Sequence, residues 1–184
     1  YYDNFDLDVN IIENSNKNKH VLTKKVIEDK ATYAIGKSSL VLDKFEGNDI
    51  ILLSAIFQNS PMILVSLSDS NIKTPRDLIN KKIMITNNAK QSASIKSILI
   101  SEGVSFNDII INDSSSEGLN KLIDKNIDVL ACYLSNEPYI LKEKNIPFNI
   151  ISPDKYNFDF YEGILFTYQK ELEKNPLRVQ KFNQ

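Results

Sequence analysis

The chain has 184 residues, of which 42% are hydrophobic and 25% are charged, a composition that is ordinary for a globular protein. A formal net charge of −2 provides no basic field for a phosphate backbone, which excludes nucleic acid as an expected partner. No apolar run is long enough to cross a bilayer, since the longest, Ile50–Phe57, is short and interrupted by Ser54.

Both ends of the chain indicate a segment of a longer protein. The sequence begins on Tyr1 without an initiator Met, and its last residues lie inside an apparent helix. We therefore expect that any targeting signal has been removed.

Strands alternate with helices of roughly ten residues along the chain, a rhythm that predicts parallel βαβ units. The predicted strands are Asp6–Ile11, Tyr33–Gly36, Ile50–Phe57, Met62–Leu67, Ile83–Thr86, Ile109–Ile111, Val129–Tyr133, Phe148–Ile151 and Ile164–Thr167. The predicted helices begin near His20, Ser38, Thr74, Ser92, Ser114, Asn136 and Asn175. The only histidine, His20, is expected to be solvated or to cap its helix rather than to catalyse a reaction.

One break in this rhythm has two interpretations. The strands Ile50–Phe57 and Met62–Leu67 follow one another with only a short turn and no helix between them. The chain either crosses here from one sheet to another or forms an antiparallel hairpin at a sheet edge. Periodicity alone leaves both alternatives open.

The most informative segment is the end of the strand Val129–Tyr133 and the helix start Asn136-Glu137-Pro138. Asn is a good N-cap, Glu is favoured in the first turn, and Pro is tolerated there. A strand that leads directly into a helix places polar groups at the carboxyl end of a sheet, where α/β proteins bind ligands. The alternative is that these residues only start a helix.

Two other loops have the same strand–loop–helix form. Gly36–Ser39 and Asn87–Ser92 each offer polar groups at a helix start, so each is either a cradle for an anion or carbonyl group or a simple helix cap. Tyr161 and its aromatic neighbours could stack on a flat ring, although such residues are more often part of a core.

Catalytic and metal-binding motifs are missing from the sequence. There is no Gly-x-Ser-x-Gly nucleophile turn and no histidine pair for zinc, so neither a metal nor a cofactor is expected. The single cysteine, Cys132, cannot form an internal disulfide and is predicted to be a small buried side chain. Glu137 could act as a general base only if burial raised its pKa, and a hydrogen bond to a ligand is the simpler role.

Six short motifs occur in a characteristic order. They are Tyr-Ala-Ile-Gly-Lys-Ser-Ser-Leu (33–40), Ala-Ile-Phe-Gln-Asn-Ser-Pro (55–61), Thr-Pro-Arg-Asp-Leu-Ile-Asn-Lys-Lys-Ile (74–83), Asn-Glu-Pro-Tyr (136–139), Phe-Asp-Phe-Tyr-Glu-Gly-Ile-Leu-Phe (158–166) and Glu-Lys-Asn-Pro-Leu-Arg-Val-Gln-Lys-Phe (173–182). In this order they resemble the NMT1/THI5-like family of periplasmic solute-binding proteins, which includes thiamine-precursor and SsuA-like binders and is related to the yeast thiamine-pyrimidine synthase. The resemblance covers nearly the whole chain.

The resemblance implies an α/β fold of the type II periplasmic-binding-protein class, with two βαβ lobes joined by a hinge. The first lobe is expected to comprise residues 1–60 and 155–184, and the second residues 61–154. The break after Phe57 then becomes the hinge passage, with a return near Ile150–Asp159. The resemblance also implies that an initial strand and helix and the closing C-terminal helices are absent from this sequence.

Two positions depart from the family pattern. Asn80 stands where the family usually has glycine, although asparagine also tolerates a left-handed conformation. Residues 162–166 contain no cysteine where the synthases carry a cysteine-rich cluster, so their iron-dependent chemistry has no ligands here. This favours a binding protein over the alternative, an enzyme of thiamine-pyrimidine synthesis or a related transferase.

The resemblance and the motifs together predict one ligand site between the lobes. Its predicted ligand-binding residues are Ser38, Ser39, Gln58, Gln91, Ser92, Asn136, Glu137 and Tyr161. The implied ligand is a thiamine-precursor pyrimidine or a similar small nitrogenous heterocycle. The expected location is periplasmic or extracytoplasmic, with tethering through segments outside this chain. The expected partner is an ABC permease or a membrane receptor of the histidine kinase or diguanylate cyclase type.

Overall fold

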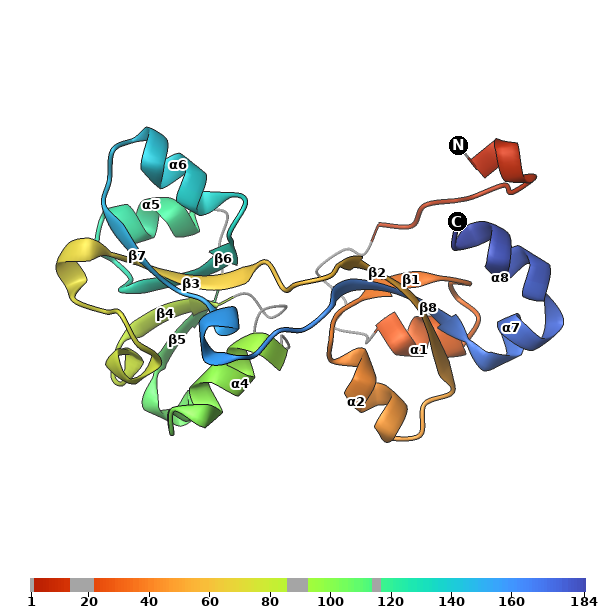
Figure 1. The fold of residues 1–184 in the computed structure, drawn as a ribbon, viewed down its shortest axis with the longest axis horizontal. Coiled ribbons are helices and arrows are strands. Elements are labelled where there is room, and N and C mark those ends of the chain that lie inside the picture. The colour runs from red at the N-terminus through yellow and green to blue at the C-terminus, as the bar shows by residue number, and fades with distance from the viewer. Residues whose placement is uncertain (1, 14–21, 86–92, 114–116) are drawn as a thin grey trace. The chain divides into compact units, whose positions relative to one another are not determined.

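Two β-sheets organise the chain, each in its own unit (Figure 1). The computed structural model describes residues 2–13, 22–85, 93–113 and 117–184. One unit comprises Tyr1–Phe57 and Tyr161–Gln184, and the other comprises Gln58–Phe160. The first unit is therefore built from two separate stretches of sequence, whereas the second is continuous.

The first unit contains a three-stranded antiparallel sheet in the order β1-β8-β2. Its strands are β1 (Ala34–Gly36), β2 (Ile50–Phe57) and β8 (Glu162–Tyr168). Its helices are the 3₁₀ helix η1 (Tyr2–Phe5), α1 (Leu22–Ile27), α2 (Leu40–Phe45), α7 (Gln169–Lys174) and α8 (Pro176–Phe182). Since β1 and β2 both pair antiparallel with β8, they run in the same direction, and β8 lies between them. Buried Ile50 and Phe166 belong to the core of this unit.

The second unit contains a five-stranded mixed sheet in the order β5-β4-β6-β3-β7. Its strands are β3 (Met62–Leu67), β4 (Lys82–Ile85), β5 (Ile110–Asp113), β6 (Val129–Tyr133) and β7 (Phe148–Ile151). Its helices are α4 (Ala93–Ser101), α5 (Gly118–Ile123) and α6 (Glu137–Glu143), with 3₁₀ turns η2 (Ser68–Ser70), η3 (Pro75–Leu78), η4 (Phe106–Asp108) and η5 (Pro153–Tyr156). Strands β5, β4 and β6 are parallel, and β3 is antiparallel to both β6 and β7.

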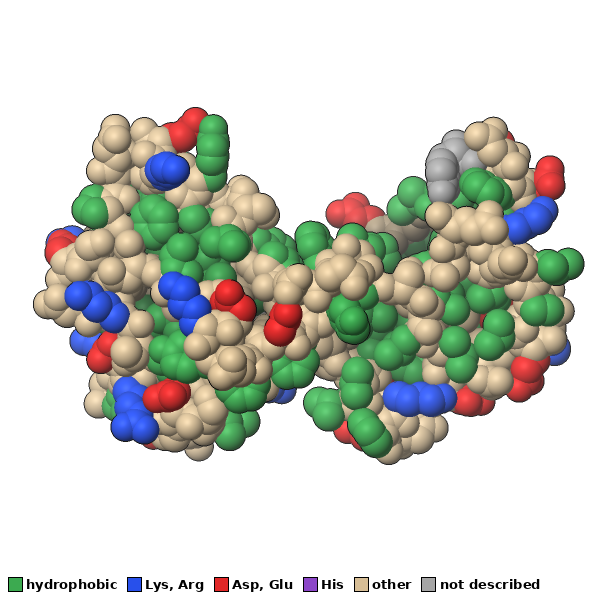
Figure 2. All heavy atoms as spheres, in the orientation of Figure 1, with side chains coloured by type: hydrophobic (Ala, Val, Ile, Leu, Met, Phe, Trp, Pro, Cys, Tyr) green, Lys and Arg blue, Asp and Glu red, His purple; other side chains and the backbone are tan. Residues whose placement is uncertain are grey.

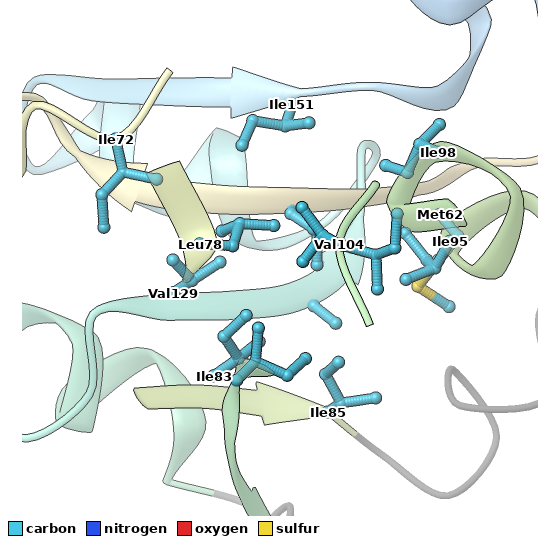
Figure 3. Close-up of a cluster of buried hydrophobic side chains, with 14 residues drawn as sticks. Met62, Ile72, Leu78, Ile83, Ile85, Ile95, Ile98, Val104, Val129 and Ile151 are labelled. Carbon is cyan, nitrogen blue, oxygen red and sulfur yellow. The ribbon is translucent and has the colours of Figure 1, made fainter. Parts of the chain in front are cut away.

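Strand β3 is buried along its whole length. Its side chains alternate between two hydrophobic clusters, with Met62 and Leu64 in one and Ile63 and Val65 in the other. Figure 3 shows the first cluster, where Met62 lies beside Ile95 of α4. The apolar run Met62–Val65 follows from this position, because a strand covered on both faces has no solvent side for polar residues. Ser66, also buried, donates its hydroxyl to the Ile72 carbonyl at 2.8 Å.

The two consecutive strands that break the rhythm lie in different sheets, β2 in the first and β3 in the second. The chain therefore crosses between units here, and the alternative of an antiparallel hairpin is wrong. The returning segment runs from β7 to β8. The side chains of Asn59 and Asp159, one from each connecting segment, are hydrogen-bonded, so the two segments lie side by side where they leave the second unit.

The prediction of parallel βαβ units is correct for β5, β4 and β6 of the second sheet and wrong for the pairings of β3 and β8. Among the described strands, parallel pairing occurs only between β4 and its neighbours β5 and β6. β8 and β3, which each follow a passage between units, run against their neighbours. Alternation of strands and helices predicts parallel neighbours only while the chain stays within one sheet.

The predicted first strand, Asp6–Ile11, is also wrong. Residues 7–13 form neither helix nor strand, and Ile11 and Ile12 are 83% and 63% exposed. Alternating polar and apolar residues favour a strand only where a neighbouring strand satisfies the backbone, and no described strand pairs with this segment.

Near Thr74 the predicted helix start is correct, but the helix is short. A capping box links Thr74 and Asp77 around the 3₁₀ helix η3, which ends at Leu78. Asn80 then adopts the left-handed conformation with φ of 61°, as expected for asparagine in a position that favours glycine. The predicted starts at His20 and Ser114 lie outside the described residues.

A buried carboxylate fixes the C-terminal helices to the first sheet. Glu171 is 2% exposed, and its two oxygens accept hydrogen bonds from Arg178 Nε and Nη2, each at 2.7 Å. Asn175 Nδ2 and the Tyr33 hydroxyl also donate to it, at 2.9 and 3.2 Å. The Tyr33 ring stacks on Phe182 with centroids 4.0 Å apart. Burial, together with the charge of Glu171, raises the pKa of Tyr33 to about 12.

We expect Arg178→Ala to lower the free energy of unfolding by about 2 to 3 kcal/mol, because it leaves the Glu171 carboxylate buried without its cation. The matched control is Arg76→Ala, which breaks the more exposed Arg76–Glu102 pair and should cost less than about 1 kcal/mol. Urea unfolding measures both changes. Equal losses would show that the Glu171 network contributes no more than a surface ion pair.

Candidate functional site

In the second unit, the carboxyl ends of the parallel strands share one sheet edge with the start of β3. The register places Met62 of β3 opposite Tyr133 at the end of β6, while β4 runs parallel to β6. At this edge the Ser60 hydroxyl lies 3.1 Å from that of Ser94, which is completely buried in the first turn of α4. This is the edge where open α/β sheets bind ligands.

The loop between β6 and α6 presents two of the predicted site residues. Asn136 occupies the N-cap position, as predicted, but its side chain makes no capping bond. Instead its Nδ2 donates to Glu137 Oε1 at 3.3 Å. The other oxygen, Glu137 Oε2, is buried and has no hydrogen-bond partner among the described residues. An unsatisfied buried acceptor of this kind costs on the order of 1 to 3 kcal/mol.

Cys132 lies at the end of β6 next to this carboxylate. The residue is 6% exposed, which confirms the prediction of a small buried side chain. Burial, then the negative charge of Glu137 and then a hydrogen bond from the thiol to Glu137 raise the pKa of the Cys132 thiol far above its usual range. The thiolate, which is the reactive form, is therefore strongly disfavoured.

Exposed apolar side chains flank the Glu137 carboxylate along the chain. Tyr133, Leu134 and Tyr139 are 45%, 53% and 61% exposed. Small-molecule sites commonly combine a few polar groups with apolar and aromatic walls. The polar Asn136 and Glu137, together with these three apolar and aromatic side chains, fit that pattern.

In the first unit, the ends of β1 and β2 meet the start of β8. The register pairs Gly36 with Ile164 and Phe57 with Glu162. The loop after β1 turns tightly against α2, since a Cβ added at Gly36 would lie only 2.7 Å from Leu40 Cδ1. The candidate polar residues of this unit follow directly in that loop.

Ser38 and Glu162 are brought together at this edge. Ser38 Oγ donates to Glu162 Oε1 at 3.2 Å, and the two residues are 6% and 5% exposed. Ser39 is the N-cap of α2 and makes no side-chain capping bond. Sequence reasoning missed Glu162, because the only signal was an acidic residue where the related synthases carry cysteine. The register of β8 against β2 brings Glu162 close to Ser38, and this register cannot be read from the local sequence.

The four remaining predicted site residues are either exposed near the passages between units or outside the described residues. Gln58 and Tyr161 are exposed and lie at the first positions after the two passages between units. Gln91 and Ser92 lie outside the described residues. The structure thus pairs Asn136 with Glu137 within one unit, and the grouping of all eight residues around one ligand stays a prediction.

The described residues were also compared with the requirements of a metal site and of a membrane-spanning helix. They contain no cluster of three His, Cys, Asp or Glu side chains suited to a metal ion. Over the same ranges, no helix is both long and apolar enough to traverse a bilayer.

Acidic and basic side chains are interspersed on the face shown in Figure 2. A shallow hollow of about 420 Å³, lined by Ser68, Lys142 and Phe148 among others, lies at the far end of β3 from Met62.

Comparison with known proteins assigns the fold. The family model described as NMT1/THI5 like matches residues 1–184. The structure is similar to the SsuA protein named as a periplasmic sulfonate-binding component of an ABC transporter from Methylobacillus flagellatus (TM-score 0.66, 21% identity, 88% of this chain and 49% of that one). It is also similar to the aliphatic sulphonate-binding protein SsuA from Escherichia coli (TM-score 0.65, 14% identity, 88% and 55%).

A third similar structure is an ABC uptake transporter substrate-binding protein from Streptococcus pneumoniae with bound histidine (TM-score 0.57, 13% identity, 88% and 63%). No curated protein matches the chain in sequence. The predicted type II periplasmic-binding-protein fold is confirmed, and the chain spans about half the length of the SsuA proteins that it matches.

We expect the Cys132 thiol of the folded protein to react with a disulfide reagent at pH 8 at least about 100-fold more slowly than after unfolding in guanidinium, because it is buried beside a carboxylate. Absorbance of the released thiolate measures both rates. Comparable rates in the two states would contradict the burial of Cys132.

Proposed function

Because the chain belongs to the NMT1/THI5-like family, we propose that it is an extracytoplasmic solute-binding module that closes on a small nitrogenous ligand. The ligand class is a thiamine-precursor pyrimidine or a similar heterocycle with N–H donors. In this proposal each unit supplies residues to one site, and closure excludes water and thereby strengthens the hydrogen bonds to the ligand.

The observation that carries the proposal is the buried, unpaired oxygen of Glu137. A carboxylate oxygen that is buried away from water without a hydrogen-bond donor lowers the stability of the folded protein. A ligand amine or ring N–H would remove that penalty and would gain a charge-assisted hydrogen bond. Asn136 holds the other carboxylate oxygen, which fixes the direction of the free one.

The proposed partner is a membrane protein that recognises the closed form. Delivery to an ABC permease is supported by neighbours whose names describe ABC-transporter binding proteins. The same closure would serve a membrane receptor with a histidine kinase or diguanylate cyclase output. We propose no catalytic role, and the strongly raised pKa of the Cys132 thiol supports that choice.

A thermal-shift panel of pyrimidines, thiamine, amino acids, sulfonates and polyamines tests the proposal. A ligand present at 100-fold over its dissociation constant adds about 2.7 kcal/mol to the free energy of unfolding, which gives a clear shift in Tm. We expect the pyrimidine to give the largest shift. A panel in which no nitrogenous compound stabilises the protein would overturn the proposed ligand class.

Glu137→Ala is expected to weaken binding of the best panel ligand at least about tenfold without lowering the Tm of the free protein. The variant removes the unsatisfied Oε2, and the hydrogen bond from Asn136 that it also removes is long, at 3.3 Å, and exposed. The control Glu143→Ala removes an exposed acid from the last turn of the same helix and should leave affinity unchanged. Calorimetric titration gives both affinities, and equal affinity in Glu137→Ala would remove Glu137 from the site.

A further inference from the structure

Glu137, the first residue of α6, has a carboxylate with no cationic partner in the described part of the chain. Its Oε2 is buried and accepts no hydrogen bond from any described residue. None of the ion pairs that the described residues form includes Glu137. The basic residues of the same helix, Lys142 and Lys144, lie in its last turn and at its C-cap. Within the described ranges, the charge of Glu137 is therefore not neutralised.

The groups that hold this carboxylate are themselves uncharged. The Asn136 amide donates to Oε1 at 3.3 Å. The Cys132 thiol forms another hydrogen bond to the carboxylate, and its strongly raised pKa keeps it protonated and neutral. The first turn of a helix also favours a negative side chain. Glu137 is thus an oriented anion whose neighbours bring no positive charge to it.

Glu171 shows the opposite arrangement in the first unit. Both of its oxygens accept hydrogen bonds from Arg178, each at 2.7 Å, so its charge is neutralised within the protein. That buried carboxylate is tolerated because a cation of the same chain accompanies it. No described residue plays the part of Arg178 at Glu137, and a ligand can supply the charge instead.

We propose that Glu137 selects a ligand group that carries a positive charge, such as a protonated amine or an amidinium. The inference rests on the proposed solute-binding function and adds to it the charge of the group that meets Glu137. An N–H donor of such a group satisfies the buried Oε2, and its charge neutralises the carboxylate. A neutral N–H donor does only the first.

A cationic group gains more from this carboxylate than a neutral one. Opposite charges in hydrogen-bond contact attract at close range, and partly buried surroundings weaken that attraction less than bulk water does. Desolvation of the ligand cation removes part of the gain. We expect a net preference of at least about tenfold in affinity. This selectivity differs from that of the structurally similar proteins that are named for sulfonates, which are anions.

Three probes of one shape separate charge from hydrogen bonding. Benzamidine is a cation at pH 7, benzamide is neutral and benzoate is an anion, and each carries a planar group on the same ring. Benzamidine and benzamide both offer N–H donors, so they differ at Glu137 in charge. Glu137→Gln removes the charge of the protein and keeps an acceptor oxygen. The control Glu143→Gln removes the same charge from an exposed position in the last turn of α6.

Thermal unfolding first shows whether each variant folds, and calorimetric titration then gives the affinities. We expect the wild type and Glu143→Gln to bind benzamidine at least about tenfold more tightly than benzamide, and to bind benzoate more weakly than either. Glu137→Gln is expected to bind benzamidine and benzamide with equal affinity. A preference for benzamidine that persists in folded Glu137→Gln overturns the inference. So does a wild type that binds benzamidine no more tightly than benzamide, including one that binds neither, whether or not Glu137→Gln folds.

The thermal-shift panel separates this result from the proposed function. If a pyrimidine of the panel stabilises the protein but benzamidine has no advantage over benzamide, the charge requirement fails and the solute-binding function stands. If no nitrogenous compound of the panel stabilises the protein while benzamidine shows the Glu137-dependent preference, the pyrimidine-like ligand class fails and the cation site stands.

Discussion

The fold depends on two strands that run against their neighbours, β3 in the second sheet and β8 in the first. Each is the strand that the chain enters after passing from one unit to the other. Because an antiparallel strand starts where its neighbours end, the passages leave each unit at the edge that holds the carboxyl ends of the other strands. The candidate residues of both units lie at these edges for that reason. In each unit, the position of the candidate site thus follows from strand direction.

Three buried or partly buried glutamates show how differently one residue type is used in this protein. Glu171 has a bidentate arginine and two further donors, and it holds helices in place. Glu162 is bonded to a serine hydroxyl at a sheet edge. Glu137 has one oxygen buried without a partner among the described residues. The progression runs from a carboxylate satisfied within the protein to one that still needs a donor.

Local patterns were sufficient for the elements that depend on local physics. The buried strand β3 and the Asn136-Glu137-Pro138 helix start were both predicted from sequence, because burial on two faces and capping preferences act over a few residues. The segment 6–11 failed, since a strand needs a partner that its own sequence does not specify. Glu162 was missed because its contact with Ser38 spans 124 positions and depends on the register of β8.

The discontinuity of the first unit has a consequence for how the protein folds. The second unit is one continuous stretch, so all of its strands are available before the chain is complete. β1 and β2, by contrast, pair with each other only through β8, which the ribosome makes more than 100 residues after β2 begins. Closing so long a loop carries an entropic cost that shorter-range contacts do not. During synthesis the second unit can therefore fold first, and the first unit assembles around its central strand only when β8 arrives.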